Sequence, residues 1–123
     1  MIDLKSAVQT CRAQILLDLD ASDFRWPDVL MVQAANWVIL EMLNRKPILA
    51  FSAPNTYAEA DDFLIPEGAL SNGGTFEVAF PSRYREAFVH GLAARCFNGD
   101  AHRQTEAARM AVELQRFNDL MAL

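Results

Sequence analysis

The sequence predicts a mainly α-helical fold: a four-helix, bundle-like body with an extended, partly β-hairpin arm between the second and third helices. Apolar residues recur at helical spacing in four segments, whereas prolines and glycines concentrate at about 47–81, where they exclude a long helix. The chain has 123 residues, of which 52% are hydrophobic and 22% charged. These numbers favour a single domain, residues 1–123, with one core.

The first two helices are predicted on either side of a polar loop. Residues 4–19 carry one apolar stripe, and Asp3 is the expected N-cap. The second helix is expected to open at Pro27, which is tolerated in the first turn, with Asp28 favoured there by the helix dipole. It ends near Asn44 and is apolar on nearly all faces, so it is expected to be the central helix.

The arm, at about 47–81, is predicted to be extended or to form a small hairpin. Residues 48–51 and 63–65 are short extended candidates, and residues 75–80 alternate between apolar and polar side chains. A turn at residues 72–74 is expected to start that last strand. The length of the stretch indicates a functional element.

The last two helices are predicted to form an antiparallel hairpin. Ser82 is the expected N-cap of the third helix, which runs to Asn98 and carries small residues that allow close helix packing. Gly99 is expected to end that helix and Asp100 to cap the next one. The fourth helix carries a heptad-like apolar stripe: Ala107, Met110, Leu114, Phe117 and Met121.

Charge and hydropathy exclude several classes of function. The net charge is −5 with an isoelectric point of about 4.9, and such a surface repels phosphate backbones, so no sequence-specific nucleic-acid binding is expected. No apolar run has the length of a membrane span, so no membrane association is expected. Asp3 and Lys5 replace the basic flank and apolar block of a signal peptide, so no signal peptide is expected. This pattern indicates synthesis and use in the cytosol.

The sequence shows no catalytic or metal-binding pattern. His90 and His102 could serve as a general base or metal ligands, but we expect a residue on a polar helix face and one near a helix terminus, with no carboxylate or thiol at a matching spacing. Cys11 and Cys96 are expected to be buried thiols. The chain is therefore predicted not to be an enzyme and to need no cofactor or metal.

A few charged and aromatic residues have both a structural and a binding interpretation. Asp61 and Asp62 form an acidic cluster without the spacing of a calcium loop, which favours a solvated loop. Arg83 and Arg85 oppose the dipole at the start of the third helix, so either a neighbouring carboxylate holds them or they are simply exposed. Two tryptophans are candidates for interface anchors, although core packing is their more common fate: Trp26 and Trp37.

Three segments of the chain carry a resemblance to a known family. The first is residues 15–18, Ile-Leu-Leu-Asp, followed by residues 24–28, Phe-Arg-Trp-Pro-Asp. The second is residues 63–66, Phe-Leu-Ile-Pro, and the third is residues 80–87, which lead into the Ala-rich residues 93–96. In this order they resemble the tailed-bacteriophage head-to-tail adaptor proteins, also called head completion or connector proteins, over most of the chain.

The resemblance implies a structural virion protein with a helical-bundle body. Such adaptors form a homo-oligomeric ring of about twelve subunits beneath the portal at the capsid vertex, and the ring is a conduit for genome DNA. The implied partners are the portal protein and the next tail or neck protein. The implied location is the neck of the virion, after synthesis in the host cytoplasm. The acidic charge suits a channel through which DNA slides without sticking.

The resemblance also implies two sets of contact residues. The C-terminal segment commonly docks on the portal, which makes candidates of Arg116, Phe117, Leu120, Met121 and Leu123. Extended segments meet a neighbour or the tail, which makes candidates of Tyr57, Asp61, Asp62, Phe63, Arg83 and Arg85. The apolar residues near position 123 support a docking site, whereas the alternative is that their stripe completes the core.

Three other functions remain open from the sequence. A tail-completion or neck protein further along the same assembly has similar features. A small helical regulatory module would form a stable dimer or a one-to-one complex and no ring. A small enzyme would use His90 or His102 as its base, in a site assembled from distant residues.

Overall fold

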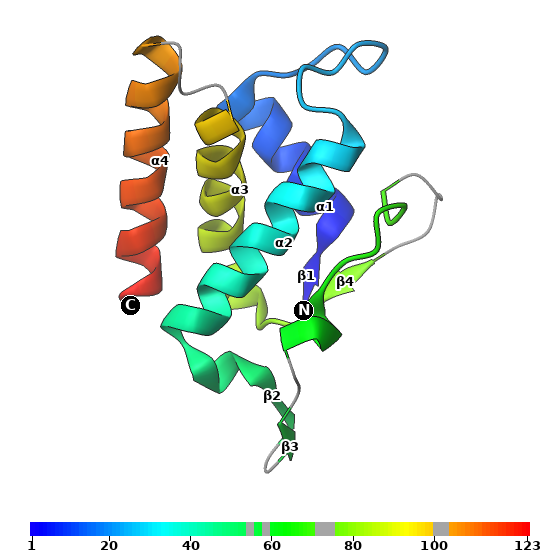
Figure 1. Cartoon of the computed structure of the whole chain (residues 1–123), viewed down its shortest axis with the longest axis vertical. Coiled ribbons are helices and arrows are strands. Elements are labelled where there is room, and N and C mark those ends of the chain that lie inside the picture. Colours follow the sequence, from blue (N-terminus) through cyan, green and yellow to red (C-terminus); the bar gives the residue numbers. More distant parts are fainter. Residues whose placement is uncertain (54–55, 58–59, 71–75, 100–103) are drawn as a thin grey trace.

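The computed structural model has a body of four helices and a two-stranded hairpin that projects from one end of it (Figure 1). It describes residues 1–53, 56–57, 60–70, 76–99 and 104–123. The helices are α1 (Leu4–Cys11), α2 (Asp28–Arg45), α3 (Arg85–Gly99) and α4 (Gln104–Met121). The mainly α-helical fold class, with a hairpin arm between the second and third helices, is confirmed.

Helix α3 lies at the centre of the body. It packs antiparallel against α4 and also contacts α1 and α2 (Figure 1). Small residues permit this position: a Cβ added at Gly91 would lie 3.0 Å from Val38 of α2 and 3.1 Å from Phe117 of α4. The second helix, which the sequence predicts as central, instead leaves Leu30 and Leu40 exposed. Its apolar surface therefore exceeds what its neighbours cover.

The first helix begins as predicted and ends early. Asp3 caps α1, and its carboxylate accepts a hydrogen bond from the Ser6 amide at 3.3 Å. The helix continues as a π-helical turn, η1 (Arg12–Leu16), and Leu17 then adopts a left-handed conformation with φ of 53°. The predicted end at residue 19 is wrong because Asp18 turns away to bind the backbone of the next segment.

Two short antiparallel sheets flank the body. Strand β1 (Ile2–Asp3) pairs with β4 (Glu77–Val78), and β2 (Phe51–Ala53) pairs with β3 (Thr56–Tyr57) in the hairpin. The first pairing joins the beginning of the chain to the strand that precedes α3. The alternation predicted around β4 is present, since Val78 and Phe80 are buried while Glu77 and Ala79 are exposed.

Neither of the two short extended candidates forms a strand along its whole length. Residues 47–50 form η2 (Pro47–Ala50), because proline fixes the backbone near helical φ, and only Phe51 of this candidate is in a strand. The turn η3 (Ala60–Phe63) ends where the second candidate, residues 63–65, was expected to start.

The third helix does not begin with the predicted cap. Ser82 lies inside a 3-10 turn, η4 (Ser82–Tyr84), in which the Tyr84 amide donates to the Pro81 carbonyl at 3.0 Å. Helix α3 follows directly from this turn, so its first amides belong to a continuous helical segment. The predicted turn at residues 72–74 and the predicted cap Asp100 lie outside the described residues.

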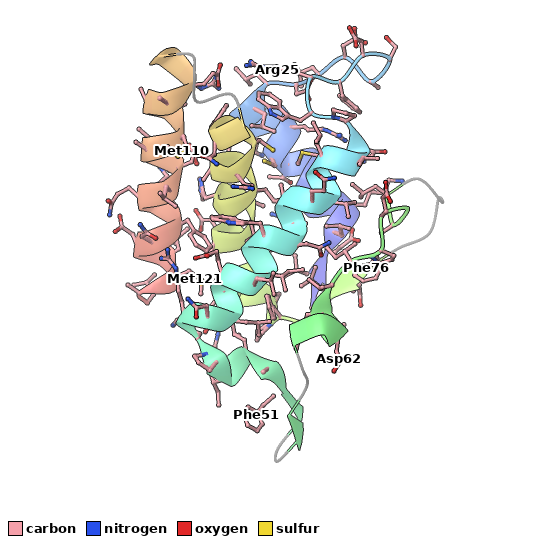
Figure 2. All side chains as sticks on the ribbon, viewed as in Figure 1. Arg25, Phe51, Asp62, Phe76, Met110 and Met121 are labelled. Carbon is pink, nitrogen blue, oxygen red and sulfur yellow. The ribbon has the colours of Figure 1, made fainter. Side chains whose placement is uncertain are left out.

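The core gathers one face of every helix and the strand β4. Its largest fully buried side chains are aromatic: Phe80, Phe88, Phe97 and Phe117. The apolar stripe of α4 turns toward the other helices, and Figure 2 shows Met110 and Met121 on that side. Met121 is buried and Met110 is partly buried, so the predicted stripe is the core-facing side of α4.

Candidate functional site

The described residues hold no group of three or more His, Cys, Asp and Glu side chains able to bind a metal ion. In the same part of the chain, no helix combines the length and apolar character needed to cross a membrane. His102, one of the two histidines considered as a base, lies outside the described residues.

One of the segments that carry the resemblance lies in the connection between α1 and α2, at residues 15–18 and 24–28. The buried Arg12 guanidinium donates to the Trp26 carbonyl at 2.7 Å and to Asp28 at 3.1 Å, and it stacks on the Phe24 ring at 3.8 Å. The buried Asp18 carboxylate accepts two backbone N–H bonds, from Trp26 and from the residue before it, each at 3.0 Å. Together these contacts hold residues 18–28 in one conformation.

The same motif attaches this connection to the rest of the body. The Trp26 indole N–H donates to the carbonyl of Cys96 in α3 at 3.1 Å, and its ring meets Phe97 edge to face. Arg25 pairs with Glu106 at the start of α4 at 3.3 Å. Trp26 is thus a core residue, as the more common fate of such a tryptophan suggested.

One end of the molecule exposes large apolar side chains. Ile48 is 70% exposed, Phe51 45% and Leu123 90%, and these three residues define the apolar end. They come from η2, β2 and the residues after α4, which all lie in the half of the molecule from which the hairpin projects (Figure 1). A hydrogen bond between Arg45 and Asn118 joins the last turns of α2 and α4 there. Figure 2 shows Phe51 beside the hairpin, away from the four helices.

The candidate portal-docking residues divide between the core and the surface. Phe117 and Met121 are buried in the core, as the alternative for their stripe expected. Leu120 is partly buried, while Arg116 and Leu123 are exposed. As folded, this segment therefore presents only Arg116, Leu120 and Leu123 to a partner.

The candidate neighbour-contact residues in the arm also divide. Asp62 is exposed on the outside of η3 (Figure 2), whereas Phe63 is buried and stacks on Phe80 at 5.3 Å between ring centroids. Tyr57 belongs to β3 and Asp61 to η3, and their side chains lie outside the described part of the chain.

The two arginines that open the third helix have different environments. Arg85 donates to the hydroxyls of Ser6 at 3.1 Å and Thr10 at 2.8 Å, so it ties α3 to α1 within the chain. The sequence predicted either a carboxylate partner or exposure for this arginine, and the structure shows hydroxyl partners at a partly buried position instead. Arg83 is exposed and its guanidinium lies over the Tyr84 ring at 5.1 Å. Arg83 is therefore the more exposed of the two.

A groove of about 950 Å³ runs between α1 with η1, η4 with α3, and α4. We call it the arginine groove, after four of its lining residues: Arg83, Arg85, Arg109 and Arg116. Apolar side chains form much of its floor and walls: Ile15, Val89, Phe97, Ala108 and Val112. The groove thus combines positive charge with an apolar surface.

His90 lies in the arginine groove and has two acidic neighbours. Its Nδ1 is 2.5 Å from a Glu113 oxygen of α4, and its Nε2 is 3.9 Å from Glu86. The expectation of no carboxylate at a matching spacing is wrong for this residue. Glu86 stands four positions before His90 and was visible as a helical neighbour. Glu113 could not be found without knowing how α3 and α4 pack.

Both cysteines are buried thiols, as the sequence predicts. Burial raises the pKa of the Cys11 thiol far above its usual range, and the nearby Cys96 and Glu113 raise it further. Because the thiolate is the reactive form, we expect a thiol reagent at pH 8 to label neither cysteine in the folded protein and both in denaturant. Mass spectrometry of the adducts counts them. Labelling of either thiol under native conditions would contradict the observed burial.

Comparison of the chain with protein-family models, with curated protein sequences and with solved structures finds no match.

Proposed function

We propose that this chain is a structural adaptor of a tailed-phage virion, which forms a ring between the portal and the tail or neck. The single observation that carries the proposal is the apolar end, where Ile48, Phe51 and Leu123 are exposed together. Large apolar side chains that are exposed in one region of a small domain favour a contact with another protein. The helical body with an arm between its second and third helices also agrees with what the resemblance implies.

The apolar end combines the C-terminal segment, to which the resemblance assigns portal docking, with the arm, to which it assigns contact with a neighbour or the tail. The C-terminal segment contributes Leu123, and the arm contributes Ile48 and Phe51. Because both segments lie at one end, we assign them together to the portal. The buried Phe117 then supports this surface from within by holding α4 against α3.

The charge of the chain agrees with a position around a DNA channel. With a net charge of −5, an assembled ring carries several times that charge, which weakens any adhesion of duplex DNA passing through it. In this proposal the protein acts in the neck of the virion, is not an enzyme and uses no cofactor. Its partners are the portal, the next tail or neck protein and further copies of itself.

Acidic substitutions at the apolar end test the proposal. We expect Ile48→Asp and Leu123→Asp each to weaken binding to the cognate portal ring by roughly tenfold or more, because each places an unpaired charge in an apolar contact. Both side chains are exposed, so folding should be unaffected. Co-sedimentation of the protein with purified portal rings provides the measurement.

Val29→Asp is the matched control. Val29 is also an exposed apolar residue, but it lies in the first turn of α2, at the opposite end of that helix from Ile48. The helix dipole stabilises a carboxylate at this position. This variant should bind the portal like the unchanged protein. Equal binding by all three variants, or an equal loss in all three, would remove the apolar end as the docking surface.

A further inference from the structure

The arginine groove concentrates positive charge on an acidic protein. It takes four of the eleven Lys and Arg residues but only two of the sixteen Asp and Glu residues, Glu86 and Glu113. One of these two, Glu113, is paired with His90. The rest of the surface is correspondingly more acidic, so the groove is complementary in charge to other parts of this same chain.

Not all of this charge is engaged within the chain. Arg85 is tied to α1, and Arg109 donates to the Ile15 carbonyl at 2.9 Å. Arg83 and Arg116 are exposed along the groove, and Val112 between the walls is 55% exposed. An occupant that fits this surface carries carboxylates beside apolar side chains.

Residues 17–23, which we call the acidic loop, have that composition. Leu17 and Leu19 are 64% and 70% exposed, and Asp20 and Asp23 are exposed beside them. The hydroxyl and the amide of Ser22 donate to Asp20, which lowers the pKa of that carboxyl and keeps it ionised. Figure 1 shows the loop projecting from the end of the body opposite the hairpin, on the side away from α4.

The acidic loop cannot reach the groove of its own chain. Asp18 and Arg12 hold both ends of the connection through buried hydrogen bonds. None of the loop residues lines the groove, although η1, which leads into the loop, forms one wall through Ile15. A loop held rigidly away from its own groove remains available to the groove of another copy.

We infer that the arginine groove binds the acidic loop of a second copy of this chain, with Leu19 against Val112 and the loop carboxylates beside Arg83 and Arg116. The contact joins two different surfaces, so it is head-to-tail and repeats from copy to copy, as a closed ring requires. This inference rests on the proposed ring and names the contact that builds it.

Phosphate groups are the other chemistry that arginines recognise. Duplex DNA is disfavoured here because Glu86 and Glu113 line the same groove. The apolar walls also have no counterpart on a phosphate backbone. The observations therefore favour a peptide loop with both carboxylates and leucines.

Cross-linking between chains tests the contact in the full-length protein. One preparation carries Leu19→Cys and another carries Val112→Cys. They are mixed at about 1 mM each, so that a contact with a Kd of about 1 mM is substantially occupied. Both native cysteines are buried, so a short bis-maleimide reaches only the introduced thiols. We expect a cross-linked dimer of the two different chains. Leu40→Cys, an exposed site on α2, replaces Val112→Cys as the control and should give little product.

Charge reversal separates a specific contact from collision. Adding Arg116→Glu to the Val112→Cys chain should lower the yield several-fold, and adding Asp23→Lys to the Leu19→Cys chain should restore it. Arg95→Glu, which changes an exposed arginine outside the groove, should have no effect. The inference would be overturned if Val112→Cys and Leu40→Cys gave equal yields, or if no cross-linked product formed. Loss of the product on adding short duplex DNA would overturn it as well.

The outcome is independent of portal binding. A protein that binds the portal but gives no cross-link on the assembled ring would refute the loop-in-groove contact and leave the adaptor proposal intact. A specific cross-link without portal binding would refute the adaptor and leave the self-association of this chain.

Discussion

Replacing Phe117 with alanine is expected to lower the free energy of unfolding by about 3–5 kcal/mol. Its ring is fully buried and lies against the Gly91 position of α3, with the Arg45 guanidinium over it at 4.9 Å. Removing the ring leaves a cavity between α2, α3 and α4 that the packed helices cannot fill. Urea unfolding followed by circular dichroism measures the change.

The control for this substitution is Val112→Ala on the same helix. Val112 is exposed, so its truncation should change the free energy of unfolding by less than about 0.5 kcal/mol. If Phe117→Ala left stability unchanged while abolishing portal binding, the ring would be a docking residue and not part of the core. That result would mean that the stripe of α4 that includes Phe117 faces a partner and not α3.

Replacing Asp18 with alanine is expected to cost about 2–4 kcal/mol of stability, because two backbone N–H groups lose their acceptor in a largely buried site. The connection between α1 and α2 then loses its fixed shape, and Trp26 loses the constraint on its position. Urea unfolding gives the free energy, and tryptophan fluorescence reports the local change.

Asp23→Ala is the matched control for the Asp18 substitution. It removes a carboxylate from the same connection, but Asp23 is exposed, so the free energy of unfolding should change by less than about 0.5 kcal/mol. A similarly small effect of Asp18→Ala would mean that its hydrogen bonds do not hold residues 18–28 in place. The acidic loop would then be free to move.

The helices were predictable because their signals are local. An apolar stripe, a capping residue and a cluster of prolines all lie within a few turns of one another, as with Asp3 at the start of α1 and Pro47 after α2. The stripe of α4 likewise identified Phe117 and Met121 as candidates for one surface. Whether that surface was core or docking face depended on α3, which sequence spacing does not place.

The features that were missed depend on contacts between distant segments. The pairing of β1 with β4 joins the two-residue beginning of the chain to the arm, and two residues carry no recognisable strand pattern. Glu106 is charged and yet buried, because Arg25 reaches it from the α1–α2 connection at 3.3 Å. No periodicity in α4 indicates such a partner.

The arginine groove shows the same limit at the candidate site. Its residues come from α1, η1, η4, α3 and α4, and no one of these segments alone carries a distinctive cluster of charge. The sequence made Arg83 and Arg85 candidates for contact with a neighbour or the tail, and Arg116 a candidate for portal docking. The fold places all three on one groove, together with Arg109.

The central claim is that the chain forms a ring against a portal through its apolar end. Electron microscopy of the purified protein, alone and mixed with its cognate portal, tests this claim most directly. We expect an added ring beneath the portal, with the hairpin and the end of α4 at the interface. A portal without added density, when both proteins are folded and concentrated, would contradict the adaptor function.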